Sequence, residues 1–374
     1  MKSTQMLVAK SLSEFNVMRK QLLGSGGNKL IGFVPTMGNL HDGHLELMKT
    51  AKRHSDIVVT SIFVNPAQFA AHEDFDKYPR TLENDLNKMK EIGVDLVLAP
   101  QNITEIYPKE YMTRVFMSKI STQTAAETHP LRNTQGGGTS LNQESKIFVN
   151  WLEDQPEAQC RPGFFDGVST ILVKLFNIVR PQVVVFGQKD AVQCMVVKQL
   201  VRDLNYVDIE KVIIGETCRE KDGLAMSSRN QYLSSIDRTF IAPILNQTLR
   251  RAEEELSKLT NSVSPLTNQI LQKWLEDSYE YLEQLFNKNL KEHYSGQDLS
   301  SMASSKYCID YLSICDWENG HVYGTISTNK EYSVPNFKIE SADQNRELCL
   351  SGTIRVGGTR LLDNLIIKRI AIQN

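Results

Sequence analysis

Strand-like apolar runs alternate with amphipathic helical patterns over residues 1–216, and this alternation restricts the fold more than any other feature of the sequence. Runs rich in β-branched and apolar residues predict strands at 30–34, 57–64, 94–98, 183–186 and 212–214. Between them, helical spacing of apolar residues predicts helices at 44–54, 81–90, 168–179 and 191–204. Because strand–helix–strand connections are right-handed and make neighbouring strands parallel, we expect an α/β fold, a Rossmann-like doubly wound parallel sheet.

The remaining residues, 217–374, predict a second, smaller, lid-like α+β domain at the C-terminus. A helix is predicted at 269–290, and strands are predicted at 307–314, 348–356 and 361–372. Two segments interrupt the pattern, at about 121–144 and 257–305. The first is polar and rich in Gly, Thr and Gln, so it cannot bury much surface. We interpret both as insertions.

Charge and cysteine usage narrow the classes of function. The chain has 374 residues and a formal net charge of -2, so it lacks the overall basic field that holds nucleic acid or anionic membranes. No apolar run is long enough to span a bilayer, and the first residues lack the apolar core of a signal peptide. The six cysteines form no CxxC pair, which is typical of reduced thiols in a cytosolic protein. We expect a cytoplasmic protein that binds neither membrane nor nucleic acid.

The segment PTMGNLHDGH, residues 35–44, carries the first candidate site. It follows a predicted strand and leads into a predicted helix, the place where open parallel sheets bind ligands and where free N–H groups attract phosphate. His41 and His44 share one face of the first helical turn, and Gly43 removes a side chain that would block a ligand. The chain has no Gly-rich P-loop or dinucleotide fingerprint. An HxxH pair also occurs by chance, and a zinc site would need further ligands that are not evident nearby.

Two more segments have the composition of phosphate-binding loops. In DGLAMSSRN, Ser227 and Ser228 can donate hydrogen bonds and Arg229 supplies a charged fork. In FGQKD, Lys189 can reach phosphate and Asp190 can accept a bond from a ribose hydroxyl. Taken singly, the first is equally a loop with a solvated arginine, and the second an ordinary strand–helix turn with a capping aspartate.

Seven segments in one order carry a family resemblance: PTMGNLHDGH, SIFVNPAQF, YPRTLENDL, RPGFFDGVSTILVKLFNIVRP, FGQKD, DGLAMSSRNQYL and TRLLDN. Together they resemble the pantoate–β-alanine ligases, in the HxGH nucleotidyltransferase-like superfamily. The resemblance covers most of the chain apart from the two insertions and about 327–347. It implies synthesis of pantothenate, AMP and pyrophosphate from pantoate, β-alanine and ATP through a pantoyl adenylate, with Mg²⁺, in a homodimer. The alternatives are another HxGH nucleotidyltransferase and a catalytically inactive nucleotide-binding relative.

The resemblance also implies roles for individual residues. His41, His44 and Lys189 would be catalytic. The residues expected at ATP are Met37, His41, His44, Gly187, Lys189, Asp190, Cys218, Met226, Ser227, Ser228 and Arg229. The residues expected at pantoate are Asn65, Gln68 and Gln193. Asp85 would hold Mg²⁺, or is an exposed helix aspartate.

Two positions depart from the pattern that the resemblance implies. Gln188 stands where the family usually has Glu, and we expect its side chain to point away from the ligand. Phe164 stands where His is common, which removes a polar group near the site. Arg161 and Tyr78 lie in the matched segments, but the resemblance assigns them no specific role.

Overall fold

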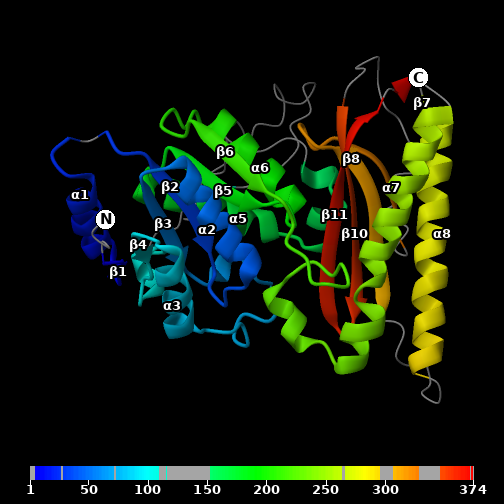
Figure 1. Cartoon of the computed structure of the whole chain (residues 1–374), viewed down its shortest axis with the longest axis horizontal. Helices are drawn as coiled ribbons and strands as arrows, with labels where there is room; N and C mark the ends of the chain where they lie inside the picture. The colour runs from blue at the N-terminus through cyan, green and yellow to red at the C-terminus, as the bar shows by residue number, and fades with distance from the viewer. Residues whose placement is uncertain are drawn as a thin grey trace, which may run out of the picture.

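A computed structural model describes residues 5–26, 28–70, 73–108, 115, 152–262, 266–294, 306–327, 346–370 and 372–373. The predicted insertion at 121–144 lies outside these residues, as does the end of the second predicted insertion, from 295 to 305. Figure 1 shows two sheets side by side, each with helices against it. Within the described part of the chain, no helix is both long and apolar enough to cross a membrane.

The first sheet is parallel and six-stranded, with the order β1-β4-β3-β2-β5-β6. Its strands are β1 (Leu7–Ala9), β2 (Ile31–Thr36), β3 (Ile57–Ile62), β4 (Leu96–Leu98), β5 (Val183–Gly187) and β6 (Lys211–Gly215). The connecting helices are α1 (Leu12–Leu23), α2 (Asp42–His54), α3 (Leu82–Ile92), α5 (Phe164–Val179) and α6 (Ala191–Asp203). This confirms the predicted doubly wound α/β fold.

Alternate residues of the central strands enter two separate cores, as the two-residue period of a strand requires. Phe33 of β2 and Val184 of β5 pack in one core with residues of α1, α5 and α6. Val34 and Val185 pack in the other, with residues of α2 and α3. Both faces of the sheet are therefore covered, which explains why its strands read as continuous apolar runs.

Strand β2 continues through Pro35, where the sequence predicted its end. Proline lacks the N–H that a central strand normally contributes to the ladder. Here the pairing of β2 with β5 stops at Phe33, while the pairing with β3 runs on to Thr36. Beyond Phe33, β2 therefore pairs with a neighbouring strand on one side only, and proline is tolerated there.

The second sheet is antiparallel and four-stranded, with the order β11-β10-β8-β9. Its strands are β8 (Cys308–Asp316), β9 (Val322–Ile326), β10 (Arg346–Val356) and β11 (Thr359–Ile370). Helices α7 (Ile244–Ser262) and α8 (Asn268–His293) cover one face and share a core with it. On the other face, Cys315 and Cys349 join the core that contains α6. The smaller mixed C-terminal unit is confirmed, while the boundary at 216 stays a prediction.

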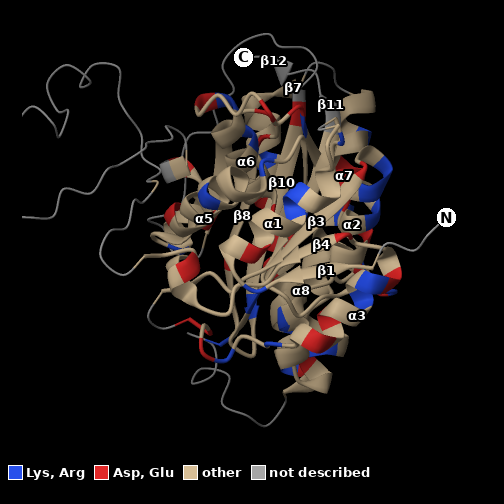
Figure 2. Cartoon of the chain, turned by 90° about the vertical axis from the view of Figure 1, so that its left-hand side faces the viewer, with Lys and Arg blue, Asp and Glu red and all other residues tan. Residues whose placement is uncertain are grey.

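Charged residues of both signs are interspersed along the helices, as Figure 2 shows. This distribution agrees with a formal net charge of only -2. Attraction of an anionic ligand must therefore come from a local group of side chains, because the surface as a whole supplies no strong field.

Candidate active site

The turn between β2 and α2 is held from behind by Asp85, on the first turn of α3. Its carboxylate is fully buried and accepts hydrogen bonds from the backbone N–H groups of Asn39 (2.8 Å) and Leu40 (2.9 Å). The Thr81 hydroxyl donates a third bond, at 3.1 Å. Gly38 and Asn39 have φ values of 87° and 52°, the left-handed region that such a tight turn needs. Asp85 is therefore not an exposed helix aspartate, and its contacts give it the role of fixing the turn that carries the histidines.

His41 is the residue before the first turn of α2, and His44 lies three positions further on that helix. Their ring centroids are 4.1 Å apart. The backbone N–H of His41 donates to His44 Nδ1 at 3.3 Å, so a neutral His44 carries its proton on Nε2. Among the described residues, His41 Nδ1 is buried without a hydrogen-bond partner.

Gly43 makes room for His41 itself, where the sequence suggested that it leaves room for a ligand. A Cβ atom at position 43 would lie 2.9 Å from His41 Cε1 and 3.0 Å from Nδ1. It would also come within 3.6 Å of Cys218 Cβ, on the loop after β6. The missing side chain is thus what lets the His41 ring fold back over the start of α2.

Both histidines are held in the neutral form. Burial, together with the positive charge of Lys189, lowers the pKa of His41 to about 4. Burial also lowers the pKa of His44 well below its usual value, with additional effects from His41 and Lys189. At neutral pH each imidazole of the pair can therefore offer one N–H donor to an oxyanion.

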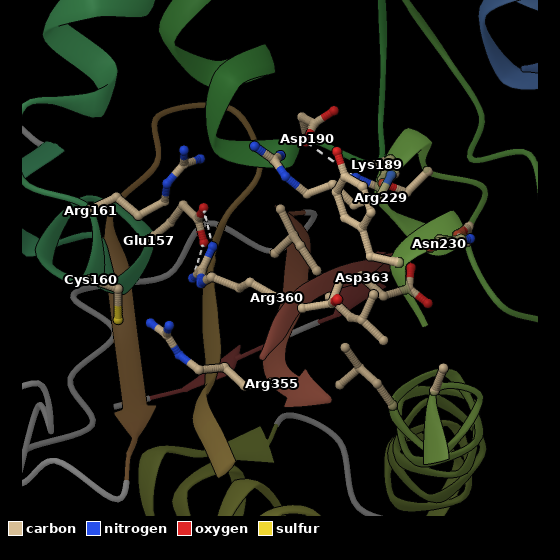
Figure 3. A pocket seen from close by; sticks show the side chains of 18 of the residues that line it. Glu157, Cys160, Arg161, Lys189, Asp190, Arg229, Asn230, Arg355, Arg360 and Asp363 are labelled. Carbon is tan, nitrogen blue, oxygen red and sulfur yellow. Dashed lines mark hydrogen bonds and ion pairs between the residues drawn. The ribbon is translucent and has the colours of Figure 1, made fainter. Parts of the chain in front are cut away.

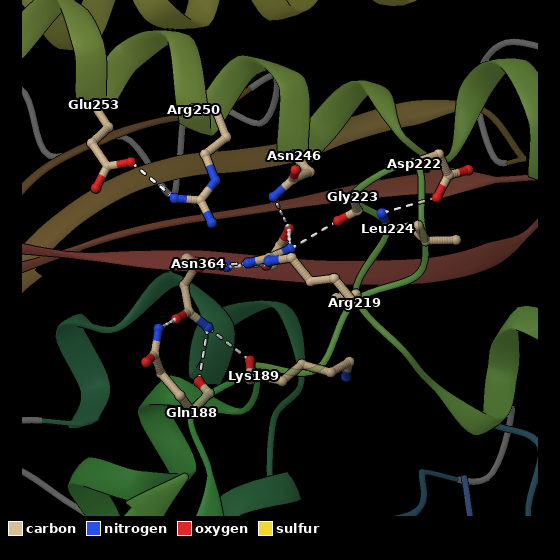
Figure 4. A network of polar contacts seen from close by, with 12 residues as sticks. Gln188, Lys189, Arg219, Asp222, Gly223, Leu224, Asn246, Arg250, Glu253 and Asn364 are labelled. Atoms are coloured by element: carbon tan, nitrogen blue, oxygen red, sulfur yellow. Dashed lines mark hydrogen bonds and ion pairs between the residues drawn. The ribbon is translucent and has the colours of Figure 1, made fainter. Parts of the chain in front are cut away.

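Lys189 lies in the turn between β5 and α6, and Asp190 is the residue that precedes α6. Lys189 Nζ is 3.5 Å from Asp190 Oδ1. The turn is tied to the second sheet by Asn364 of β11, which donates to the carbonyl oxygens of Gln188 and Lys189 (Figure 4). Gln188 in turn donates to Asn364 Oδ1 at 3.1 Å, so its side chain is directed at β11.

The loop from Cys218 to Arg229 folds onto the histidine turn. Ser228 Oγ donates to the carbonyl oxygen of Asn39 at 3.0 Å, and the N–H of Met226 donates to the carbonyl of Cys218 at 2.9 Å. Ser227 accepts a bond from the N–H of Arg229 at the start of a short 3₁₀ turn.

Arg229 does not point freely toward a ligand, because it is already paired with Asp74. Its Nε and Nη2 donate to the two carboxylate oxygens of Asp74 at 3.1 and 2.9 Å. Sequence reasoning missed this pair, since Asp74 lies 155 positions away and belongs to no phosphate-binding pattern. A phosphate ligand that takes the Nε and Nη2 donors of Arg229 must displace this carboxylate.

The residues expected at pantoate divide into two groups. Gln68 and Met37 lie together, with Gln68 Nε2 at 3.2 Å from Met37 Sδ. Asn65 is 1% exposed; it donates to Gln68 Oε1 and to the Gly167 carbonyl, and it accepts a bond from Tyr107. These contacts make Asn65 the support that orients Gln68. Gln193 is on α6 and lines the cavity described next.

A cavity of about 370 Å³ opens between the two sheets (Figure 3). Of the predicted site residues, Lys189, Asp190, Gln193, Ser227 and Arg229 line it. His41, His44 and Gln68 do not line it, although Lys189 is near enough to shift the pKa of both histidines.

The opposite wall of the cavity is rich in arginine, which sequence reasoning did not anticipate. Arg355 and Arg360 reach it from the second sheet, and Arg161 from the segment before α5. Arg161 pairs with Glu73 at 3.0 and 3.1 Å, and its guanidinium carbon lies 3.4 Å from the centre of the Phe164 ring. Phe164, the departure from the family pattern, is thus a platform under Arg161.

Comparisons with known proteins match nearly the whole chain. A family model described as pantoate-beta-alanine ligase matches residues 8–366. The pantothenate synthetase of Thermoanaerobacter sp. (strain X514) is 42% identical over 271 residues, 71% of this chain and 82% of that protein. The crystal structure of pantothenate synthetase from Thermus thermophilus matches with a TM-score of 0.64 and 30% identity, over 97% of this chain and 99% of that one.

A pantoate-beta-alanine ligase from Francisella tularensis, solved in a complex with beta-gamma ATP and beta-alanine, matches with a TM-score of 0.59. Its identity is 25%, and the match covers 97% of this chain and 98% of that one. These likenesses extend over both sheets and over the turns between them.

Proposed function

The chain belongs to the pantoate–β-alanine ligase family, and we propose on that basis that it joins pantoate to β-alanine with consumption of ATP. The observation that carries the proposal is the neutral histidine pair at the end of β2, beside Lys189, in a chain that the family model matches over residues 8–366. The finer steps below are our assignment of chemistry to these residues.

In the first step a pantoate carboxylate oxygen attacks the α-phosphorus of ATP, and the bond to the β-phosphate oxygen breaks. The products are pantoyl adenylate and pyrophosphate. The attack places negative charge on the α-phosphate oxygens, where His41 and His44 offer N–H donors and Lys189 a positive charge. Preorganised donors of this kind contribute about 3–4 kcal/mol each to the transition state. No protein nucleophile is required, because such transfers depend mainly on positioning and countercharge.

In the second step the amine of β-alanine attacks the acyl carbon of the adenylate. The new C–N bond forms, the C–O bond to AMP breaks, and the nitrogen loses its extra proton. We assign Gln68 and Gln193 to the hydroxyl and carboxylate groups of pantoate, because an amide both donates and accepts without a full charge. Ser227, Ser228 and Arg229 would close on the triphosphate, with Arg229 leaving Asp74.

The contacts of Asp85 and Asp74 do not fit a protein-held magnesium ion. Asp85 already accepts three hydrogen bonds, and Asp74 is paired with Arg229. We propose that Mg²⁺ arrives with ATP, held by phosphate oxygens and water as this ion prefers. No side chain is assigned to it, and no step depends on it.

The test of the reaction is a nucleotide analysis of ATP incubations with pantoate and β-alanine, added singly and together. With both, AMP and pantothenate should appear in equal amounts. With pantoate alone, pyrophosphate should exchange into ATP. A nucleotide retained in the product would indicate a different nucleotidyltransferase, and ATP binding without turnover would indicate an inactive relative.

His44→Ala tests the role of the histidine pair. Loss of one oxyanion donor should lower pyrophosphate–ATP exchange by about 10²–10³-fold, with the thermal unfolding temperature little changed. The matched control is His54→Ala, which removes an exposed histidine from the end of the same helix and should leave exchange unchanged. Near-normal exchange by His44→Ala would overturn the assignment.

Two further expectations belong to this proposal. A homodimer is testable by sedimentation at concentrations that span the micromolar range. A cytoplasmic location is testable by fractionation of the native cell.

A further inference from the structure

Asn364, on the edge strand β11, directs its whole side chain at the turn that carries Lys189. It is fully buried. Its Nδ2 donates to the carbonyl oxygens of Gln188 at 2.9 Å and Lys189 at 2.8 Å, and its Oδ1 accepts from Gln188 Nε2 at 3.1 Å (Figure 4). Both amide hydrogens and the amide oxygen are therefore engaged with two consecutive residues of another element.

The backbone that carries Asn364 is itself fixed by its neighbour Asp363. Arg219 donates to both carboxylate oxygens of Asp363, and Asn246 of α7 donates to one of them at 3.1 Å. Arg219 also donates to the carbonyl oxygen of Asn364 at 3.3 Å. Asp363 is 4% exposed, so the carboxylate at the centre of this network is buried.

The first sheet holds the same turn through backbone bonds at its two ends. The N–H of Gln188 donates to the Gly215 carbonyl of β6 at 2.8 Å, and the N–H of Asp190 donates to the Gly187 carbonyl at 3.2 Å. Neither bond involves the carbonyl oxygens of Gln188 and Lys189, which are the two that Asn364 contacts. The peptide carbonyls on either side of Lys189 are thus held by a side chain from the second sheet.

We infer that Asn364 is a positioning residue for Lys189: it fixes the backbone from which the ammonium group reaches the nucleotide phosphate. The inference rests on the proposed role of Lys189 in ATP binding and goes beyond it by placing the control of that lysine in the C-terminal sheet. The TRLLDN segment then acts at the nucleotide site without touching the nucleotide.

The physical requirement is for two donors, which the amide of Asn364 provides. An aspartate has the same shape but accepts only, so it would face two carbonyl oxygens without a hydrogen to offer. Removing a donor from a buried pair leaves unsatisfied acceptors, and the turn would move to find water. Gln188, where the family usually has Glu, adds a reciprocal bond that a carboxylate could not donate.

The test is a double-mutant cycle with Asn364→Asp and Lys189→Ala. ATP affinity is measured by calorimetry, which needs no second substrate, and pyrophosphate–ATP exchange is measured in parallel. In the native background Asn364→Asp should weaken ATP binding by about 10–100-fold. In the Lys189→Ala background the same change should weaken it by less than about threefold, because the group it positions is gone.

The inference would be overturned if Asn364→Asp weakened ATP binding equally in the native and Lys189→Ala backgrounds. It would also be overturned if Asn364→Asp left ATP binding unchanged. The control for general damage to the second sheet is Ser313→Ala, which removes a buried hydroxyl of β8 that bonds to residues of β9. It should leave ATP affinity unchanged. Gln188→Glu keeps both bonds that Asn364 donates, so this variant should lose less than about threefold in ATP affinity.

These outcomes separate the inference from the proposed reaction. If the native protein makes no pantothenate but the cycle in ATP binding is non-additive, the proposed reaction fails and the positioning role stands. If pantothenate forms and the cycle is additive, the proposed reaction stands and the positioning role of Asn364 fails.

Discussion

At the scale of single residues, the histidine pair shows how burial selects one protonation state. A charged imidazole would attract phosphate more strongly, but at this site it would face Lys189 while buried. The neutral ring keeps a directional donor and avoids that cost. In the proposed binding mode, the negative charge of a triphosphate would raise the pKa of both histidines, and ATP binding would then be accompanied by proton uptake.

The low pKa of His41 predicts a loss of stability in acid. In the unfolded chain this histidine has its ordinary pKa of 6.5, and in the native protein about 4. As the pH falls below 6.5, the unfolded state binds a proton that the native state does not, so the stability falls until the pH approaches 4. His41→Gln removes this contribution. Between about pH 7.5 and about pH 4.5 the variant should lose about 2 kcal/mol less than the native protein in urea unfolding.

His54→Gln is the control for this pH series, because His54 is exposed on the last turn of the same helix. Its stability should follow the native curve at every pH. Parallel curves for His41→Gln and the native protein would show that His41 is not held neutral.

At the scale of elements, the loop with Ser227, Ser228 and Arg229 is held by contacts with Asn39 and Asp74. Arg229 is joined by two bonds to Asp74, in the segment before α3. Burial alone would raise the pKa of Asp74, but hydrogen bonds and charge from Arg229 outweigh it and lower that pKa. These two bonds hold the loop against the segment before α3.

Asp74→Asn should release this loop. The neutral amide cannot form the charged pair with two hydrogen bonds to Arg229. A hydrogen bond between charged groups contributes about 1.5–3 kcal/mol to stability. Limited trypsin digestion should then cleave after Arg229 at least about tenfold faster than in the native protein, and ATP should restore protection. Glu253→Gln, which disturbs an exposed pair on α7, should not change the cleavage rate. An unchanged rate for Asp74→Asn would mean that the pair does not hold the loop.

The elements themselves were largely predictable, because most strands and helices around the site are encoded by a local pattern. The predicted helix at 81–90 is α3, with Thr81 before it and Gly93 at its end in the left-handed conformation, φ 82°. Strand β1 and helix α1 were not predicted, nor were α7 and β9; three-residue β1 is too short to show a period.

The partners of the site residues were not predictable, since they depend on contacts between distant segments. Asp85 was expected at a metal, and no local pattern indicates that its carboxylate would meet the N–H groups of residues 39 and 40. The same holds for Asn364, which lies 175 positions from Lys189. Residue types at the ends of parallel strands were enough to predict a candidate site, but the hydrogen bonds that orient those residues follow only from the tertiary structure.

At the scale of the whole molecule, a buried ion pair joins the two halves of the chain. Glu157 lies on α4 (Pro156–Cys160), before α5 of the parallel sheet, and Arg360 lies on β11. Arg360 donates to the two oxygens of Glu157 at 2.7 Å each, and the Tyr311 hydroxyl donates at 2.9 Å. Arg360 also donates to Asp310 of β8 at 2.9 Å. The pair lines the cavity of Figure 3, so the same wall of the cavity also connects the two sheets.

Glu157→Gln tests how strongly this connection holds the fold. Arg360 would keep Asp310 as its charged partner, and leaving a buried charge partly uncompensated should lower the free energy of unfolding by about 2–4 kcal/mol in urea titration at about pH 7. Glu157→Gln with Arg360→Met removes both charges and should recover part of that loss, since buried pairs are often replaceable by apolar residues. Glu253→Gln breaks an exposed pair of similar length and should cost less than about 1 kcal/mol.

The same pair predicts a second acid-sensitive step, distinct from that of His41. Burial alone would raise the pKa of Glu157, but the charge and hydrogen bonds of Arg360 outweigh it and lower that pKa to about 2 from 4.5. The contribution of Glu157 is therefore complete above pH 4.5 and is lost as the pH falls toward 2. Glu157→Gln should be less stable than the native protein at about pH 6, and the difference should shrink steadily below about pH 4.5. A difference that stays constant down to about pH 2.5 would mean that the carboxylate of Glu157 is not the group that this ion pair keeps charged.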